Sequence, residues 1–343
     1  MQFRTIFGIS EKPAIHAYRG FGSKSEVVVL GRITESQTEL KTKSQVGLIH
    51  ALRFTRSYLA KPLPMVKVRV DFAGASTIVT TNKTGVFEAH IIPNKLEHSP
   101  ATEWFTAVIS LPEYPNVPVK TAPVLVEGNN NTYGVISDVD DTILISNATK
   151  KAKLLYATIF KSPRKRLPFK GVGELYNAFV RGAQSMSSNP IFYVSSSHWN
   201  LYDFLKEFFS LNNLPKGPFL LKKTSSLTSL LTTVGKHNQK HDSIVAILKA
   251  YPRLPFILVG DSGQKDAEIY ANIAQEFPGR IKSIYIRDLN IGDNKIVEKA
   301  ISSLQNSVPL IAAKTSYEIA EHAFKNNLIG DESLAKVKLS VQT

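Results

Sequence analysis

From Tyr133 onward, short apolar runs alternate with segments of helical periodicity, and this alternation restricts the fold more than any other feature of the sequence. Each apolar run has the length of one buried strand, and each intervening segment is long enough for a helix. A chain of this kind folds as a mainly parallel sheet with helices on both faces. The expected strands are Tyr133–Ile136, Pro190–Val194, Gly217–Leu221, Pro255–Gly260, Arg280–Ile286 and Val308–Ala312.

The expected helices follow the same alternation. Apolar side chains at i, i+3, i+4 and i+7 predict a helix over 199–209, directly after the second strand. A capping box, in which Glu318 follows Thr315 by three residues, predicts the start of a last helix. The other expected helices lie over 244–251 and 266–276.

Residues 1–130 have a different pattern, which predicts a small β-rich, sandwich-like domain ahead of an α/β domain at 131–343. Strict alternation of apolar and polar residues over Val66–Phe72 is typical of a half-buried strand. One inserted helix is expected at Gln45–Ala60, and the asparagine cluster Gly128–Asn131 is the expected connector. The other expected strands are Glu26–Ile33, Val86–Ile91, Trp104–Leu111 and Pro123–Val126.

Polar side chains follow three of the strands in the α/β domain, at the point where each strand ends. Asp138 and Asp140 follow the first strand, Ser195 follows the second, and a glycine-containing segment with Asp261 and Asp266 follows the fourth. Because the carboxyl ends of parallel strands lie at one edge of a sheet, we expect these side chains to converge. Carboxylates so close together repel one another, and a divalent cation relieves that repulsion. A site made of oxygen ligands favours Mg²⁺.

The composition narrows the possible chemistry and the possible partners. The 343 residues include no cysteine, which excludes disulfides, thiolate metal sites and cysteine nucleophiles. The formal net charge of +14 indicates anionic partners such as phosphate, nucleic acid or an anionic membrane surface. No acidic residue occurs over Thr142–Gly173 or Phe208–His241, and these basic spans lie between the polar strand ends. We expect a soluble cytoplasmic protein, because no apolar run reaches about 18 residues and the N-terminal residues lack the apolar region of a signal peptide.

The polar strand ends resemble the four motifs of the haloacid dehalogenase superfamily of phosphohydrolases. The first motif matches Asp138–Thr142, the second matches Ser195, the third matches Lys240 and the fourth matches Gly260–Asp266. In detail, the chain resembles the actin-patch type of phosphatidate phosphatase family and its bacterial relatives. The segments that carry this closer resemblance are VISDVDDTI, RLPFKGV, FYVSSSHWNLYDFL, GPFLLK and FILVGDSGQKDAEIY.

The resemblance covers about Tyr133 to Ile329 and departs from the family pattern at two positions. His198 and Ala267 stand where the family pattern has proline. The fold that the resemblance implies is a haloacid-dehalogenase-like Rossmannoid parallel sheet with a small cap insertion at about 146–170.

The resemblance also implies a role for each motif residue. Asp138 would attack phosphorus to form an aspartyl-phosphate, and Asp140 would act as the general acid and then as the general base. The Ser195 hydroxyl and the Lys240 ammonium would hold phosphoryl oxygens. The implied Mg²⁺ ligands are Asp138, Asp140 through its backbone carbonyl, Asp261, and Asp266 in a supporting position.

Two of these assignments leave alternatives open. Either of the two serines after Ser195 would also be placed to hold phosphate, and Ser197 would equally serve as the N-cap of the 199–209 helix. Lys222 and Lys236 are other basic residues near Lys240 in the sequence.

We therefore expect a Mg²⁺-dependent phosphatase that hydrolyses a phosphomonoester, with phosphatidate or a related lipid phosphate as the favoured substrate at an anionic membrane surface. One alternative is a phosphatase for a soluble or nucleic-acid phosphate, although no aromatic-rich basic motif favours nucleic acid. Another is a non-enzymatic scaffold with an inert phosphatase fold. The joint presence of Asp138, Asp140 and Asp261 argues against that last alternative.

Overall fold

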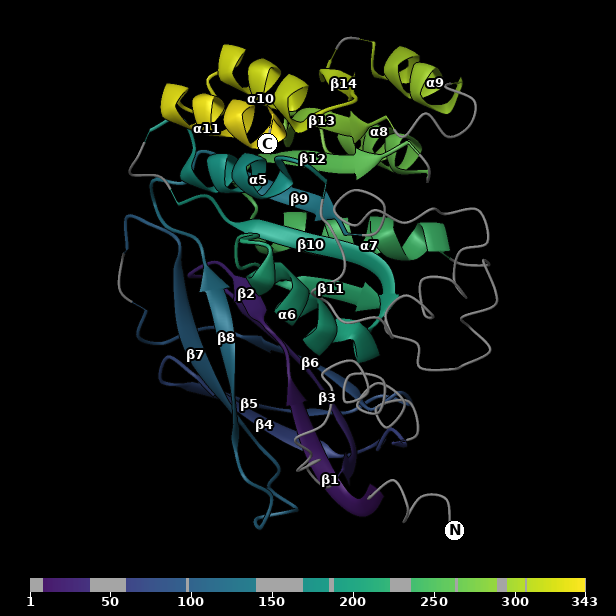
Figure 1. Cartoon of the computed structure of the whole chain (residues 1–343). Helices are drawn as coiled ribbons and strands as arrows, with labels where there is room; N and C mark the ends of the chain where they lie inside the picture. The colour runs from purple at the N-terminus through teal and green to yellow at the C-terminus, as the bar shows by residue number, and fades with distance from the viewer. Residues whose placement is uncertain are drawn as a thin grey trace.

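The chain forms two parts, a β-rich part from its N-terminal residues and an α/β part from the remainder, which lies above it in Figure 1. The computed structural model describes residues 9–37, 60–96, 99–139, 169–184, 188–222, 236–262, 265–288, 295–305 and 307–342.

A parallel sheet is the centre of the α/β part, and it has six strands among the described residues. Its strand order is β11-β10-β9-β12-β13-β14, and all neighbouring strands are parallel. β9 and β12 are buried along their whole length, because helices cover both faces of the sheet, and this explains their nearly continuous apolar sequences. The strands are β9 (Gly134–Asp138), β10 (Ile191–His198), β11 (Phe219–Lys222), β12 (Phe256–Asp261), β13 (Ile281–Arg287) and β14 (Leu310–Ala313).

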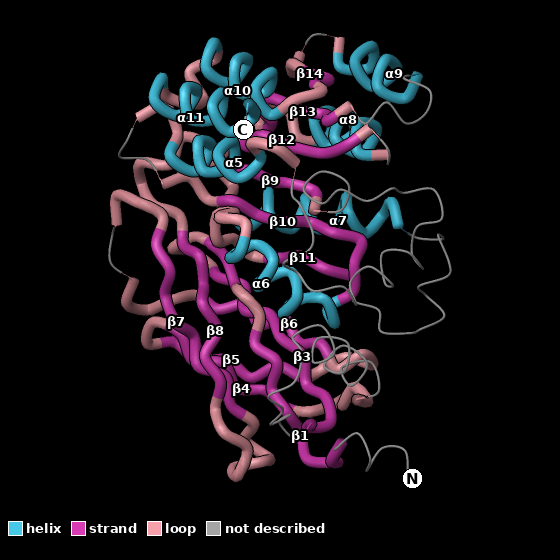
Figure 2. Tube along the Cα trace, viewed as in Figure 1, coloured by secondary structure: helices cyan, strands magenta, loops and turns pink. Residues whose placement is uncertain are grey.

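Helices cover both faces of this sheet, as Figure 2 shows. On one face α5, α10 and α11 contact one another, and on the other α8 contacts both α7 and α9. The helices are α5 (Val172–Arg181), α6 (Tyr202–Leu211), α7 (Lys236–Ala250), α8 (Asp266–Glu276), α9 (Lys295–Leu304), α10 (Ser316–Lys325) and α11 (Asp331–Gln342), with a 3₁₀ turn η2 (Trp199–Leu201) ahead of α6.

The direction in which the chain winds reverses beside β9. From β9 the chain passes to β10 and β11 on one side, and it then crosses to β12, β13 and β14 on the other side. Strands whose connections leave in opposite directions have a crevice outside their carboxyl ends, and α/β folds bind ligands there. Asp138 and Asp261 are the last residues of β9 and β12, so both lie at this crevice.

The β-rich part consists of one eight-stranded sheet within the described residues, in the order β1-β3-β2-β8-β7-β4-β5 with β6 paired to β3. β6 also contacts β4 and β5, so the sheet folds over itself and encloses a core, as in a sandwich. β2 and β8 pair in parallel, whereas the other paired strands of this sheet are antiparallel. The strands are β1 (Ile9–Ala17), β2 (Gly20–Gly22), β3 (Val27–Gln37), β4 (Lys67–Phe72), β5 (Ala75–Thr80), β6 (Val86–Ile91), β7 (Glu103–Ser110) and β8 (Lys120–Val126).

The two parts share buried side chains where they meet. Tyr18 of the β-rich part belongs to the same apolar cluster as the core of the α/β part, and its ring stacks on Trp199 with 4.1 Å between the centroids. The backbone N–H of Gly22 donates to the Tyr251 hydroxyl over 2.9 Å, and that hydroxyl donates to the carbonyl of Leu125 over 3.3 Å. Packed side chains and buried hydrogen bonds therefore join the two parts.

Most of the expected elements are observed, with differences at their ends. All six strands expected in the α/β part are present, whereas β1, β2 and β5 were not expected. The hydroxyl of Thr315 accepts from the backbone N–H of Glu318 over 3.2 Å, so the capping box is confirmed, but the helix that it opens is not the last because α11 follows. The expected helix at Gln45–Ala60 and the expected cap at 146–170 lie almost wholly outside the described residues and stay predictions.

Candidate active site

Asp138 reaches the crevice at the end of the central strand β9. Its strand is buried at every position, and Asp138 pairs in register with Val194 of β10. The carboxylate is fully buried, which is costly for an ionised group that lacks compensating charges. The surrounding side chains must therefore supply that compensation.

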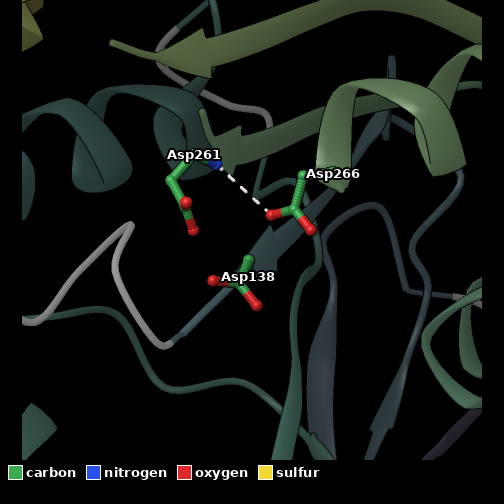
Figure 3. A group of neighbouring side chains, drawn as sticks. All are labelled: Asp138, Asp261 and Asp266. Atoms are coloured by element: carbon green, nitrogen blue, oxygen red, sulfur yellow. Dashed lines mark hydrogen bonds between the residues drawn. The ribbon is translucent and has the colours of Figure 1, made fainter. Parts of the chain in front are cut away.

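Asp261 and Asp266 lie at the end of β12 and at the start of α8. The backbone N–H of Asp261 donates to Oδ2 of Asp266 over 3.3 Å, as the dashed line in Figure 3 marks. Glycine is required at the preceding position, because a Cβ atom on Gly260 would lie 2.5 Å from Oδ2 of Asp266. The Gly-Asp pair thus lets the first turn of α8 approach the end of the strand.

The three carboxylates of Asp138, Asp261 and Asp266 face one another (Figure 3). One oxygen atom from each lies within 4.8 Å of the others, and all three residues are buried. Clustered carboxylate oxygens at this spacing suit a hard divalent cation, which would offset their mutual repulsion. The donor set, with oxygen ligands only, therefore fits the expected Mg²⁺.

Lys240 of α7 supplies positive charge to this cluster. Its ammonium lies 2.8 Å from Oδ1 of Asp138 and forms a second ion pair with Oδ1 of Asp266. Burial lowers the pKa of Lys240, but the two carboxylates outweigh burial and leave the pKa above its usual value. Lys240 is therefore a permanent cation that fixes two of the three aspartates.

The pKa of Asp266 is shifted by opposing influences. Burial raises the pKa, the ammonium of Lys240 lowers it, and the charge of Asp138 raises it again, so that the pKa of Asp266 lies above its ordinary value. Both oxygens of this carboxylate are engaged, one by Lys240 and the other by the backbone of Asp261. Asp266 thus orients Lys240 and the end of β12, and its supporting position at a metal ion stays a prediction.

Ser195 lies on β10 just beyond the point where that strand pairs with β9. β10 continues to His198 instead of ending at Val194 as expected, so the three serines belong to the strand. The Ser195 hydroxyl is buried and accepts from the backbone N–H of Ser197 over 2.9 Å. The N-cap residue of η2 is His198, so the alternative that Ser197 is the helix cap was wrong.

Some of the expected site residues lie outside the described part of the chain. Asp140, which was expected to transfer protons, is among residues 140–168, and its position stays a prediction. Among the described candidates, the structure brings Asp138, Asp261, Asp266 and Lys240 into one cluster.

Two side chains near the site, Tyr176 and Arg287, were not predicted from the sequence. The Tyr176 hydroxyl of α5 lies 2.6 Å from the hydroxyl of Ser137, the residue before Asp138. Arg287 ends β13 and pairs in register with Asp261. Arg287 could have been noticed because it is a basic residue directly after the expected apolar strand Arg280–Ile286. Nothing in the sequence marks Tyr176.

Comparison with known families agrees with this geometry. Residues 133–288 match the family described as "Phosphatidate phosphatase APP1, catalytic domain". The expected resemblance to this family is confirmed. The matched segment begins just before β9 and ends one residue after β13, so it contains the whole carboxylate cluster and Lys240.

Individual relatives match over part of their length. The Saccharomyces cerevisiae protein "Phosphatidate phosphatase APP1" is 34% identical over 154 residues, which are 45% of this chain and 25% of that protein. The Schizosaccharomyces pombe protein "Uncharacterized protein C29B5.04c" is 27% identical over 189 residues, which are 54% of this chain and 29% of that protein. The chain therefore spans less than a third of the length of either relative. A carbohydrate acetylesterase from Xanthomonas citri aligns over 84% of this chain and 72% of its own at 12% identity, with a TM-score of 0.27.

Proposed function

We propose that this protein is a Mg²⁺-dependent phosphatase that hydrolyses a phosphomonoester through an aspartyl-phosphate, with phosphatidate or a related lipid phosphate as its substrate. The observation that carries the proposal is the buried cluster of three carboxylates and one ammonium at the carboxyl edge of the sheet. The segment that forms this cluster matches the catalytic domain of a phosphatidate phosphatase family.

The proposal includes a haloacid-dehalogenase-type fold for the α/β part. A central parallel strand that ends in the first aspartate, a lysine from the helix before the next strand, and a Gly-Asp pair at the end of that strand all support this assignment. In such a site Asp138 is the nucleophile, and it is held by Lys240 through Oδ1.

The reaction would proceed in two steps. A carboxylate oxygen of Asp138 forms a bond to phosphorus, the bond from phosphorus to the leaving oxygen breaks, and that oxygen takes a proton from Asp140. Water then attacks the aspartyl-phosphate and gives a proton to Asp140, which releases phosphate and restores Asp138. Ser195 and Lys240 would hold the phosphoryl oxygens through both steps.

Asp138, Asp261 and the backbone carbonyl of Asp140 would hold the Mg²⁺ ion. Asp266 would orient them from its hydrogen bond with the backbone of Asp261. When bound, the ion would supply positive charge against the phosphoryl oxygens and the clustered carboxylates.

Phosphate release with and without Mg²⁺ tests this function. We expect release from phosphatidate in mixed micelles, and Asp138→Asn should lower kcat/KM by about 10³-fold or more because the nucleophile is lost. Asp242→Asn is the matched control, since Asp242 is exposed on α7 and its side chain is 75% accessible. Equal phosphate release by wild type and Asp138→Asn would contradict the proposal.

A lipid substrate implies contact with a membrane surface. No helix in the described part of the chain is long and apolar enough to cross a membrane. We propose peripheral binding, driven by the net charge of +14 towards anionic lipid headgroups. Soluble phosphomonoesters and 5′-phosphorylated oligonucleotides, assayed beside phosphatidate, distinguish the alternative substrates.

A further inference from the structure

Arg287 lies beside the carboxylate cluster without belonging to it. It ends β13 and pairs in register with Asp261 on the neighbouring strand. Residues that pair in register project to the same face of a sheet, so the Arg287 and Asp261 side chains share both a face and the carboxyl edge. This face is the one covered by α5, because Ser137 of β9, which also points to it, contacts Tyr176 of α5.

The guanidinium is held in place by an aromatic ring. The central carbon of the Arg287 guanidinium lies 3.3 Å from the centroid of Phe169, a residue that precedes α5 and packs against the core. Burial lowers the pKa of Arg287 to about 10, while Tyr176 favours the charged form, so the group stays protonated at neutral pH. Stacking on one face of the guanidinium leaves its N–H groups, which lie in the plane of the group, directed away from the ring.

Three other buried or half-buried basic side chains of the described residues have anionic or carbonyl partners. Lys240 pairs with two carboxylates, Arg19 donates to the carbonyl of Gly217, and Arg280 donates to three carbonyls. Within the described residues, the Arg287 side chain has neither a carboxylate nor a hydrogen-bond partner, and its contact is the ring of Phe169. A partly desolvated guanidinium that lacks an anionic partner is stabilised when an anion binds to it.

The charge of the cluster requires such a cation. Three carboxylates face one ammonium, so even with a divalent ion present the described groups carry no surplus positive charge. A phosphomonoester adds up to two negative charges, which are repelled unless a further cation receives them. Arg287 is the described cation that is placed to do so on the α5 face of the sheet.

We propose that the guanidinium of Arg287, stacked on Phe169 beside Asp261, is an oxyanion-binding group that contacts the phosphate of the substrate. This inference rests on the proposed phosphatase function and adds a phosphate-binding residue that the four motifs do not include. It assigns to Phe169 a positioning role, because the ring fixes the plane in which the N–H groups lie.

The test measures binding of inorganic phosphate to the full chain, by calorimetry and as a product inhibitor. Arg287→Met keeps the packing on Phe169 but removes the charge, and it should weaken phosphate binding and raise the inhibition constant roughly ten- to hundredfold. Arg287→Lys should lose less, because it keeps the charge without the planar fork. Arg181→Met is the control, since Arg181 is the last residue of α5, at the end remote from Phe169, and its side chain is 42% accessible.

Two outcomes overturn the inference. One is unchanged phosphate affinity in Arg287→Met with only a lower Tm, which would make the stack structural. The other is no phosphate binding by wild type. Failure of the proposed function looks different, since Asp138→Asn would then release phosphate as fast as wild type while the effect of Arg287→Met on phosphate affinity could persist.

Discussion

Lys240 forms ion pairs with both Asp138 and Asp266. Its side chain therefore holds the two carboxylates together and also adds positive charge to the site. In Lys240→Met, two buried carboxylates lose their shared cation. We expect the free energy of unfolding to fall by about 3 kcal/mol, the usual cost of breaking a buried ion pair. We expect kcat/KM to fall by at least about 10²-fold, because Asp138 is no longer held and the phosphoryl oxygens lose a cation.

Urea denaturation and steady-state kinetics measure the two effects of Lys240→Met. Lys249→Met provides the control, because Lys249 is exposed on the same helix. Wild-type kinetics in Lys240→Met would show that this ammonium serves only the stability of the fold.

His16 provides a pH dependence that is independent of the site. Its Nε2 lies 2.9 Å from the Thr34 hydroxyl, which donates its own proton to the carbonyl of Glu35, so Nε2 is the donor to Thr34. Burial lowers the pKa of His16 from 6.5 to about 4, although Asp203 favours the charged form. The folded state therefore binds fewer protons than the unfolded state between these pH values, and stability is lost as the pH falls through this window.

The contribution of His16 is on the order of 3 kcal/mol, present in full above pH 6.5 and absent by about pH 4. His16→Gln keeps a donor for Thr34 without the titration. The stability of this variant, measured from urea midpoints, should decline less steeply over the window than that of wild type. Parallel declines in the two proteins would contradict the assignment.

Among the elements, α7 depends on Arg280 at the end that is remote from Lys240. One guanidinium nitrogen of Arg280 donates to the carbonyls of Leu248, Tyr251 and Leu254 over 3.1, 2.6 and 2.9 Å. Leu248 lies in the last turn of α7 and the other two residues follow the helix, where backbone acceptors lack helical partners. Arg280→Met should lower the free energy of unfolding by about 2 kcal/mol.

The kinetics distinguish this effect on stability from an effect on the site. Well below the Tm, Arg280→Met should have a wild-type kcat/KM, since Lys240 lies near the opposite end of α7. Lys282→Met, an exposed change in β13, should alter neither quantity. A loss of activity equal to that of Lys240→Met would show that the end of α7 controls the position of Lys240.

The parallel sheet could be predicted because its strands are buried on both faces and therefore read as apolar runs. β5 could not, since its residues alternate between half-buried and exposed positions at an edge of the sheet, and three of its six residues are serine or threonine. The aspartates of the site could be predicted from their positions at strand ends. The proximity of Arg287 to Asp261 could not, because it depends on which strands are neighbours, and strand order is a property of the folded chain.

At the scale of the whole molecule, the β-rich part completes the core of the α/β part. Trp199, next to the strand that carries Ser195, is covered by Tyr18, and Tyr251 is hydrogen-bonded to backbone groups of the β-rich part. The boundary at residue 130 therefore separates two sequence patterns, but the two parts of the structure pack against each other. Buried aromatic pairs at such a junction couple the stabilities of the parts they join.

This coupling predicts that the two parts unfold together. The chain has two tryptophans, Trp104 in the β-rich part and Trp199 in the α/β part. Trp199→Phe therefore leaves a fluorescence probe in the β-rich part, and Trp104→Phe leaves one in the α/β part. We expect coincident urea midpoints from the two probes after correction for the small stability change in each variant, as two-state unfolding requires. Tyr18→Ala should separate the midpoints, because it removes the ring that packs on Trp199. Separate midpoints before that change would show that the junction contributes too little to couple the parts, and the α/β part would then fold without the other.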